Sequence, residues 1–147
     1  MANTRSSRAV GVGRVLIAVY AILALGATAR SVVQVLTKFD HAPVAYLLSG
    51  LAGLVYILAT VALLGRGDTW YRVAWITIAF ELLGVMTIGA LSLFDPVLFP
   101  ADTVWSYFGR GYLFIPLVLP VLGMLWLYRN RPARASSVAR ETTSAVA

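Results

Sequence analysis

Four long apolar stretches, separated by short polar connections, dominate the sequence. They cover about residues 13–37, 43–64, 70–94 and 104–129. An α-helix that rises ~1.5 Å per residue needs about 20 apolar residues to cross ~30 Å of hydrocarbon, so each stretch is long enough to span a bilayer. The pattern therefore predicts an all-α fold, a bundle of four transmembrane helices.

Prolines lie at one helix start and inside the last stretch. Pro43 follows a polar connection and can open the second helix, because proline is well tolerated at the first helical position. Pro116 and Pro120 lie inside the fourth stretch, where each removes a backbone hydrogen bond and predicts a kink. Outside the bundle we expect a polar cytoplasmic segment over 1–12 and a disordered cytoplasmic tail over 130–147.

The positive charges predict the orientation of the helices. Short loops rich in arginine and lysine face the cytoplasm, so both termini are expected on that side (N-in/C-in). The two opposite connections contain only Arg30, Lys38 and Arg110. The cytoplasmic flanks contain nine arginines: Arg5, Arg8, Arg14, Arg66, Arg72, Arg129, Arg131, Arg134 and Arg140.

The start of the chain also resembles a secretory signal peptide. Arginines precede an apolar run, and Ala27-Thr28-Ala29 looks like a small-residue cleavage site. The run continues past Arg30 and three more apolar stretches follow, so we favour an uncleaved membrane anchor.

The composition agrees with a membrane protein. Hydrophobic residues make up 60% of the chain and charged residues 12%, about half the charge of a typical soluble domain. The net charge of +6 could suggest a nucleic-acid partner, but the basic residues flank the apolar stretches, so we expect none. The chain has no cysteine, which excludes disulfides and thiolate metal sites.

Glu81 is the main candidate site, because it lies near the middle of the third stretch. Nine residues separate it from Arg72 at the membrane interface, which places it ~14 Å deep. An acid there costs on the order of 2.5–3.5 kcal/mol, so it should face the bundle interior. It is then either a proton- or cation-coupling carboxylate or a structural group bonded to Arg30, a tyrosine or a backbone carbonyl.

A second polar group lies toward the outer side of the membrane. Arg30 and Gln34 are four residues apart and share one helix face. Arg30 lies about 10 Å above Glu81 by helix rise, so a direct ion pair needs tilt or a bridging water. Arg30 either extends outward to the interface or joins Arg110 in contacting an anionic lipid headgroup. Trp105 is expected beside Arg110 in an interfacial aromatic belt.

Small residues indicate where helices pack closely. Ala45, Ser49 and Gly53 recur every four residues and form a smooth helix face that a neighbouring backbone can approach. Gly84 follows Glu81 by three residues and lies on the same face.

No arrangement of residues indicates catalysis. The single histidine, His41, lies beside one carboxylate and does not form a metal site, and the serines lack a nucleophile-elbow motif. We therefore expect no enzyme, no cofactor and no metal.

Several segments resemble small, uncharacterised four-span membrane proteins of actinobacteria. The segments are AVYAILALGATARS, FDHAPVAYLLSG, FELLGV and GYLFIPLVLPVLG, within about residues 14–128. The resemblance implies the architecture and a bacterial inner membrane, but no activity.

Two functions fit these features. The first is a non-enzymatic accessory or assembly subunit of a membrane complex, or a homo-oligomer, because a small-residue face is present and catalytic residues are not. The second is a small proton- or cation-coupled transporter that uses Glu81. The expected partners are the lipid bilayer and either other membrane subunits or further copies of the chain.

Overall fold

Helices form every regular element in the part of the chain that the structure describes. The computed structural model describes residues 2–131 and 144–145, and only the backbone for residues 2–9. The prediction of an all-α fold is confirmed for these residues. The elements are α1 (Ala2–Lys38), η1 (Phe39–His41), α2 (Pro43–Leu64), α3 (Asp68–Phe94), η2 (Ser106–Tyr112) and α4 (Ile115–Arg129), where η denotes a 3-10 segment.

Three of the segments are long and apolar enough to cross a membrane: Val10–His41, Pro43–Leu64 and Asp68–Phe94. A fourth span exists only if η2 and α4, which are bent by 97°, count as one broken span. The 15 residues of α4 reach only ~22 Å, which is less than the ~30 Å of a bilayer core. The described chain therefore has three to four candidate spans.

The predicted continuous helix over 104–129 has to be corrected. The backbone has positive φ at Tyr107, Phe108, Gly109, Leu113 and Phe114, between 50° and 81°. A right-handed helix cannot continue through such residues. Proline is well tolerated in the first turn of a helix, and α4 begins at Ile115 with Pro116 in its first turn. The fourth stretch is thus interrupted before Pro116, and only its second part is an α-helix.

The N-terminal helix starts earlier than the apolar pattern indicates. The sequence assigns residues 1–12 to a polar segment, whereas α1 already begins at Ala2. Each residue added to an existing helix gains a backbone hydrogen bond, and no proline interrupts this segment, so the helix extends beyond the apolar stretch. The predicted disordered tail falls mostly on residues 132–143 and 146–147, which lie outside the described residues.

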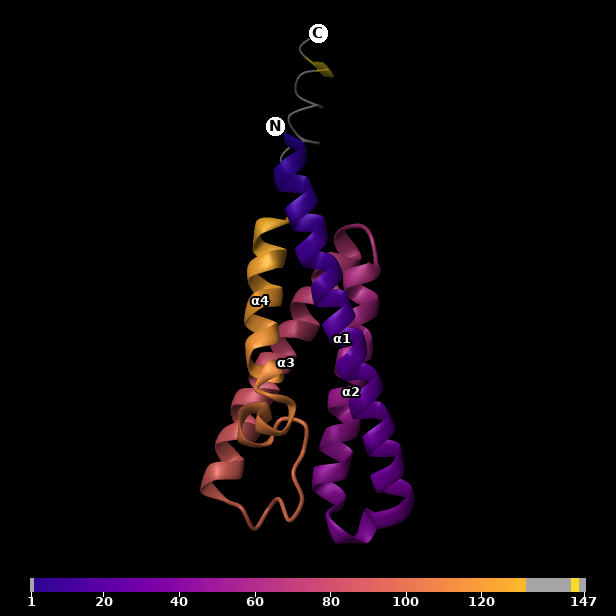
Figure 1. Cartoon of the computed structure of the whole chain (residues 1–147), viewed down its shortest axis with the longest axis vertical. Coiled ribbons are helices and arrows are strands. Elements are labelled where there is room, and N and C mark those ends of the chain that lie inside the picture. The colour runs from indigo at the N-terminus through magenta and orange to yellow at the C-terminus, as the bar shows by residue number, and fades with distance from the viewer. Residues whose placement is uncertain (1, 132–143, 146–147) are drawn as a thin grey trace.

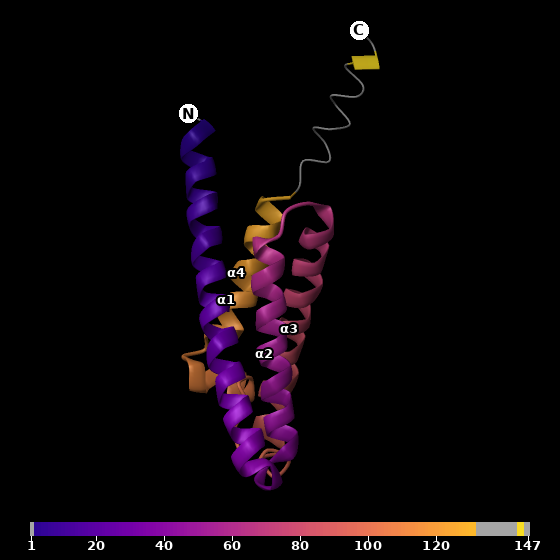
Figure 2. The same ribbon diagram turned by 90° about the vertical axis from the view of Figure 1, so that its right-hand side faces the viewer.

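The helices diverge toward one end of the molecule. The start of α1, the α2–α3 connection and the end of α4 lie at the same end of the molecule, the top of Figure 1, and α1 extends beyond the other two. At the opposite end the α1–α2 hairpin separates from the end of α3, and the irregular segment over 95–114 lies between them (Figures 1 and 2). This segment occupies the position that a full-length fourth helix would otherwise fill.

Candidate functional site

Glu81 of α3 is completely buried, with 0% of its surface exposed. The hydroxyl of Tyr20 in α1 donates a hydrogen bond of 2.7 Å to Glu81 Oε2. The second carboxyl oxygen, Oε1, is also buried and has no hydrogen-bond partner among the described residues. The sequence suggested Arg30, a tyrosine or a backbone carbonyl as the partner of Glu81, and the structure shows a tyrosine. Tyr20 forms a hydrogen bond with only one of the two carboxyl oxygens.

The two tyrosines in the bundle interior lie side by side. Tyr20 and Tyr56 of α2 are both 0% exposed, and their ring centroids are 6.3 Å apart. Helix α4 closes the other side of the site at Gly123, where an added Cβ would lie 3.5 Å from Tyr20 Oη. Residues of α1, α2, α3 and α4 thus converge around one carboxyl group.

Trp105 comes from the irregular segment and reaches the same interior. Its indole nitrogen donates a 2.9 Å hydrogen bond to the Tyr56 hydroxyl, and only 2% of the residue is exposed. Its ring lies against Gly84, where an added Cβ would approach three ring atoms to 2.7–3.0 Å. The expectation of an interfacial Trp105 is wrong, because the segment folds back between the helices and places the indole one helical turn from Glu81.

A compact turn holds Trp105 in place. The Thr103 amide donates to Ser106 Oγ over 2.9 Å, and the Trp105 amide donates to Thr103 Oγ1 over 3.1 Å. Thr103 and Ser106 are both buried, so their side chains satisfy backbone groups that lie away from water. The turn allows irregular backbone to lie inside the helical assembly.

The centre of the molecule therefore contains two hydrogen-bonded pairs, Tyr20–Glu81 and Trp105–Tyr56. Each pair joins two different elements of the chain. A buried carboxylate is expensive unless it is paired, whereas a protonated carboxyl has a hydroxyl that needs an acceptor. In the ionised form, the unpartnered oxygen of Glu81 could take up a proton or bind a small cation.

The outer polar residues are separate from this centre. The Arg30 guanidinium donates a 3.4 Å hydrogen bond to the Asp102 carbonyl and lies 6.0 Å from the centroid of the Tyr112 ring. Arg110 lies 5.4 Å from the Tyr107 ring centroid. Gln34 has a buried, unpartnered Oε1. Arg30 thus ties α1 to the segment between α3 and α4 and makes no ion pair with Glu81.

The small-residue face of α2 is used inside the chain. Ala45 and Ser49 are 0% exposed, and Gly53 is buried as well. A Cβ added at Gly53 would lie 2.9 Å from Thr28 Oγ1 and 3.3 Å from the Thr28 amide nitrogen. This face therefore allows α1 and α2 to pack closely and is not available to a second protein.

Three residues of the central site were missed from the sequence: Tyr20, Tyr56 and Trp105. A signal for the two tyrosines was present, since both lie deep inside apolar stretches, away from the ends where interfacial tyrosines are usual. A tyrosine at such depth needs a buried partner for its hydroxyl, and Glu81 offers one.

No protein-family model matches this chain, and the searches of curated proteins and of solved structures give no match either. The site must therefore be interpreted from its own geometry.

Proposed function

We propose that the chain is a four-span integral membrane protein of a bacterial inner membrane, with both termini in the cytoplasm. Three candidate spans, together with the bent pair η2 and α4 counted as a fourth, support the proposed number of four spans. The start of α1, the α2–α3 connection and the end of α4 lie at one end of the molecule (Figure 1), and the sequence concentrates its arginines in these three regions. Arginine-rich flanks favour the cytoplasmic side.

Within this topology, Glu81 serves as the binding group of a small proton- or cation-coupled carrier, and the protein is not an enzyme. The observation that carries this proposal is the unpartnered Oε1 of a fully buried acid. Ionisable groups inside membrane proteins are rare and mark ion pathways. Membrane carriers also place their sites beside interrupted helices near the midplane. This supports the proposal, because Trp105, which bonds to Tyr56, lies directly before the bent pair η2 and α4.

Ion flux into proteoliposomes tests this proposal. Vesicles containing the wild-type chain or the Glu81→Gln variant are loaded with a pH-sensitive dye, and a potassium diffusion potential drives proton entry. Sodium uptake is measured in parallel. Asp68→Asn is the matched control, since it makes the same acid-to-amide change at an exposed position of α3. We expect Glu81→Gln to reduce the flux at least tenfold and Asp68→Asn to leave it unchanged. Equal flux in all three preparations would refute the carrier.

The alternative is an accessory or assembly subunit in which Glu81 is purely structural. Two buried hydrogen bonds favour it, because Tyr20–Glu81 joins α1 to α3 and Trp105–Tyr56 joins the irregular segment to α2. Polar side chains commonly hold membrane helices together in this way. The small-residue face that suggested a docking helix is, however, occupied within the chain. Affinity isolation in mild detergent followed by native mass spectrometry tests it: recovery of a monomer alone, together with Glu81-dependent flux, would contradict this alternative.

A further inference from the structure

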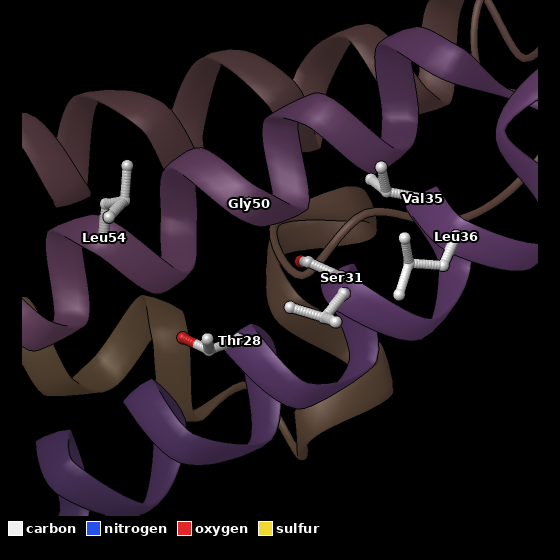
Figure 3. Close-up of a pocket in the computed structure, with 7 residues that line it drawn as sticks. Thr28, Ser31, Val35, Leu36, Gly50 and Leu54 are labelled. Carbon is white, nitrogen blue, oxygen red and sulfur yellow. The ribbon is translucent and has the colours of Figure 1, made fainter.

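A groove separates the outer surfaces of α1 and α2 near the end where the two helices join (Figure 3). Its volume is about 350 Å³. Residues that line it include Thr28, Ser31, Val35, Leu36, Gly50 and Leu54. The groove is distinct from the Glu81 centre. Binding of a ligand in the groove therefore does not depend on whether Glu81 takes part in transport.

The groove has an almost wholly apolar surface although two hydroxyl residues line it. The Oγ atoms of Thr28 and Ser31 are buried and do not reach that surface. Gly50 leaves space, because the nearest atom to an added Cβ is Ser31 Cβ at 4.0 Å. Such a surface accepts hydrocarbon and offers nothing to a polar ligand.

The length of the groove along α1 matches that of an acyl chain. From Leu36 to Thr28 it extends over eight residues of α1, or ~12 Å, close to the ~15 Å depth of one leaflet. A groove of this length with an apolar lining therefore fits an extended acyl chain.

Two opposite charges follow the last groove residue of α1, Leu36, by two and four residues. Lys38 ends α1, three residues after the lining residue Val35 and on the same helix face, and Asp40 follows in η1. Both are exposed, and neither makes an ion pair within the described chain. A cation and an anion at one membrane interface complement a headgroup that carries both a phosphate and an ammonium group.

We infer that this groove binds one acyl chain of a phospholipid with a zwitterionic headgroup of the phosphatidylethanolamine class. Lys38 contacts the phosphate, and Asp40 contacts the primary ammonium. The groove determines the length and width of the acyl chain that fits, while Lys38 and Asp40 determine which headgroup is preferred.

Lipid retention measured by native mass spectrometry tests the site. The chain is purified in detergent and titrated with phosphatidylethanolamine or phosphatidylglycerol. The variant Gly50→Leu fills the groove, and Gly26→Leu is its matched control because a Cβ at Gly26 meets nothing within 4 Å. We expect Gly50→Leu to weaken phosphatidylethanolamine binding at least tenfold and Gly26→Leu to change it less than about twofold.

The headgroup contacts are tested separately with Lys38→Gln and Asp40→Asn. A charge at the membrane surface contributes about a fivefold change in affinity, so each variant should weaken phosphatidylethanolamine binding by that factor. Asp40→Asn should also remove the preference over phosphatidylglycerol, because the anionic lipid no longer meets a carboxylate.

Three results would overturn the inference. If Gly50→Leu and Gly26→Leu reduce lipid binding equally, the groove is not the site. If both lipids bind alike and neither charge variant matters, the headgroup assignment is wrong. If the wild-type chain forms a dimer that Gly50→Leu abolishes, the occupant is a second copy.

Discussion

The contact between Gly84 and the Trp105 ring predicts that Gly84→Ala destabilises the protein. An added Cβ would lie 2.7 Å from Cζ3, 2.9 Å from Cη2 and 3.0 Å from Cε3 of the indole. The indole cannot move freely, because its nitrogen is bonded to Tyr56 and its backbone is held in the buried turn with Thr103. The new methyl group must therefore displace either α3 or the irregular segment over 95–114 that carries Trp105.

Two opposing terms determine the size of the effect. Overpacking a well-filled interior costs typically ~1–3 kcal/mol. Replacing a helical glycine by alanine returns up to about 1 kcal/mol of helix propensity. Partial loss of the Trp105–Tyr56 hydrogen bond adds roughly 1 kcal/mol to the cost. The expected net destabilisation is about 2 kcal/mol, which for a chain of this size lowers the Tm by roughly 6 °C.

Thermal unfolding in detergent, followed by circular dichroism, measures this change. Gly26→Ala is the control, since it makes the same substitution on a helix face where nothing lies within 4 Å. The control should keep or raise the Tm by a few degrees. If the two variants shift the Tm by the same amount in the same direction, Trp105 does not pack against Gly84.

Three further substitutions have expected outcomes in the same unfolding assay. Trp105→Phe removes the donor to Tyr56 and leaves a buried hydroxyl unpaired, so it should destabilise the chain by about 1–3 kcal/mol and change the near-ultraviolet dichroism. Gly53→Ala pushes a methyl group to 2.9 Å from an α1 hydroxyl and should cost about 1–3 kcal/mol. Asp68→Asn breaks an exposed 3.0 Å ion pair with Arg72 and should cost no more than ~0.5 kcal/mol, and a larger loss would contradict its exposure.

The apolar pattern was sufficient for the helices that are long and continuous. The stretch over 43–64 coincides with α2, and the stretch over 70–94 differs from α3 by two residues at its start. Such helices follow from segment length and hydrophobicity alone, because each satisfies its own backbone hydrogen bonds. Apolar character alone does not reveal an interruption, however, and the segment over 104–114 carries enough apolar residues to extend the fourth stretch.

The contacts of Glu81 were not predictable for a different reason. Helix rise gave its depth, and the high cost of a charge in lipid placed it inside the bundle, where the structure also has it. Which residue faces it depends on how α1 rotates and tilts against α3, and that is determined by packing over the whole chain. Trp105 was harder still, because its place depends on a turn closed by the side chains of Thr103 and Ser106.

A pair of variants separates a structural role of Glu81 from the proposed role in transport. In Glu81→Gln the amide oxygen can still accept the hydrogen bond from Tyr20, so the α1–α3 contact remains while the acid is lost. In Tyr20→Phe the acid remains, but Glu81 Oε2 loses its 2.7 Å donor, which should cost about 1–3 kcal/mol. A carrier therefore predicts that Glu81→Gln loses flux with little change in Tm. If Tyr20→Phe lowers the Tm and neither variant changes flux, the carboxyl group only holds the helices together.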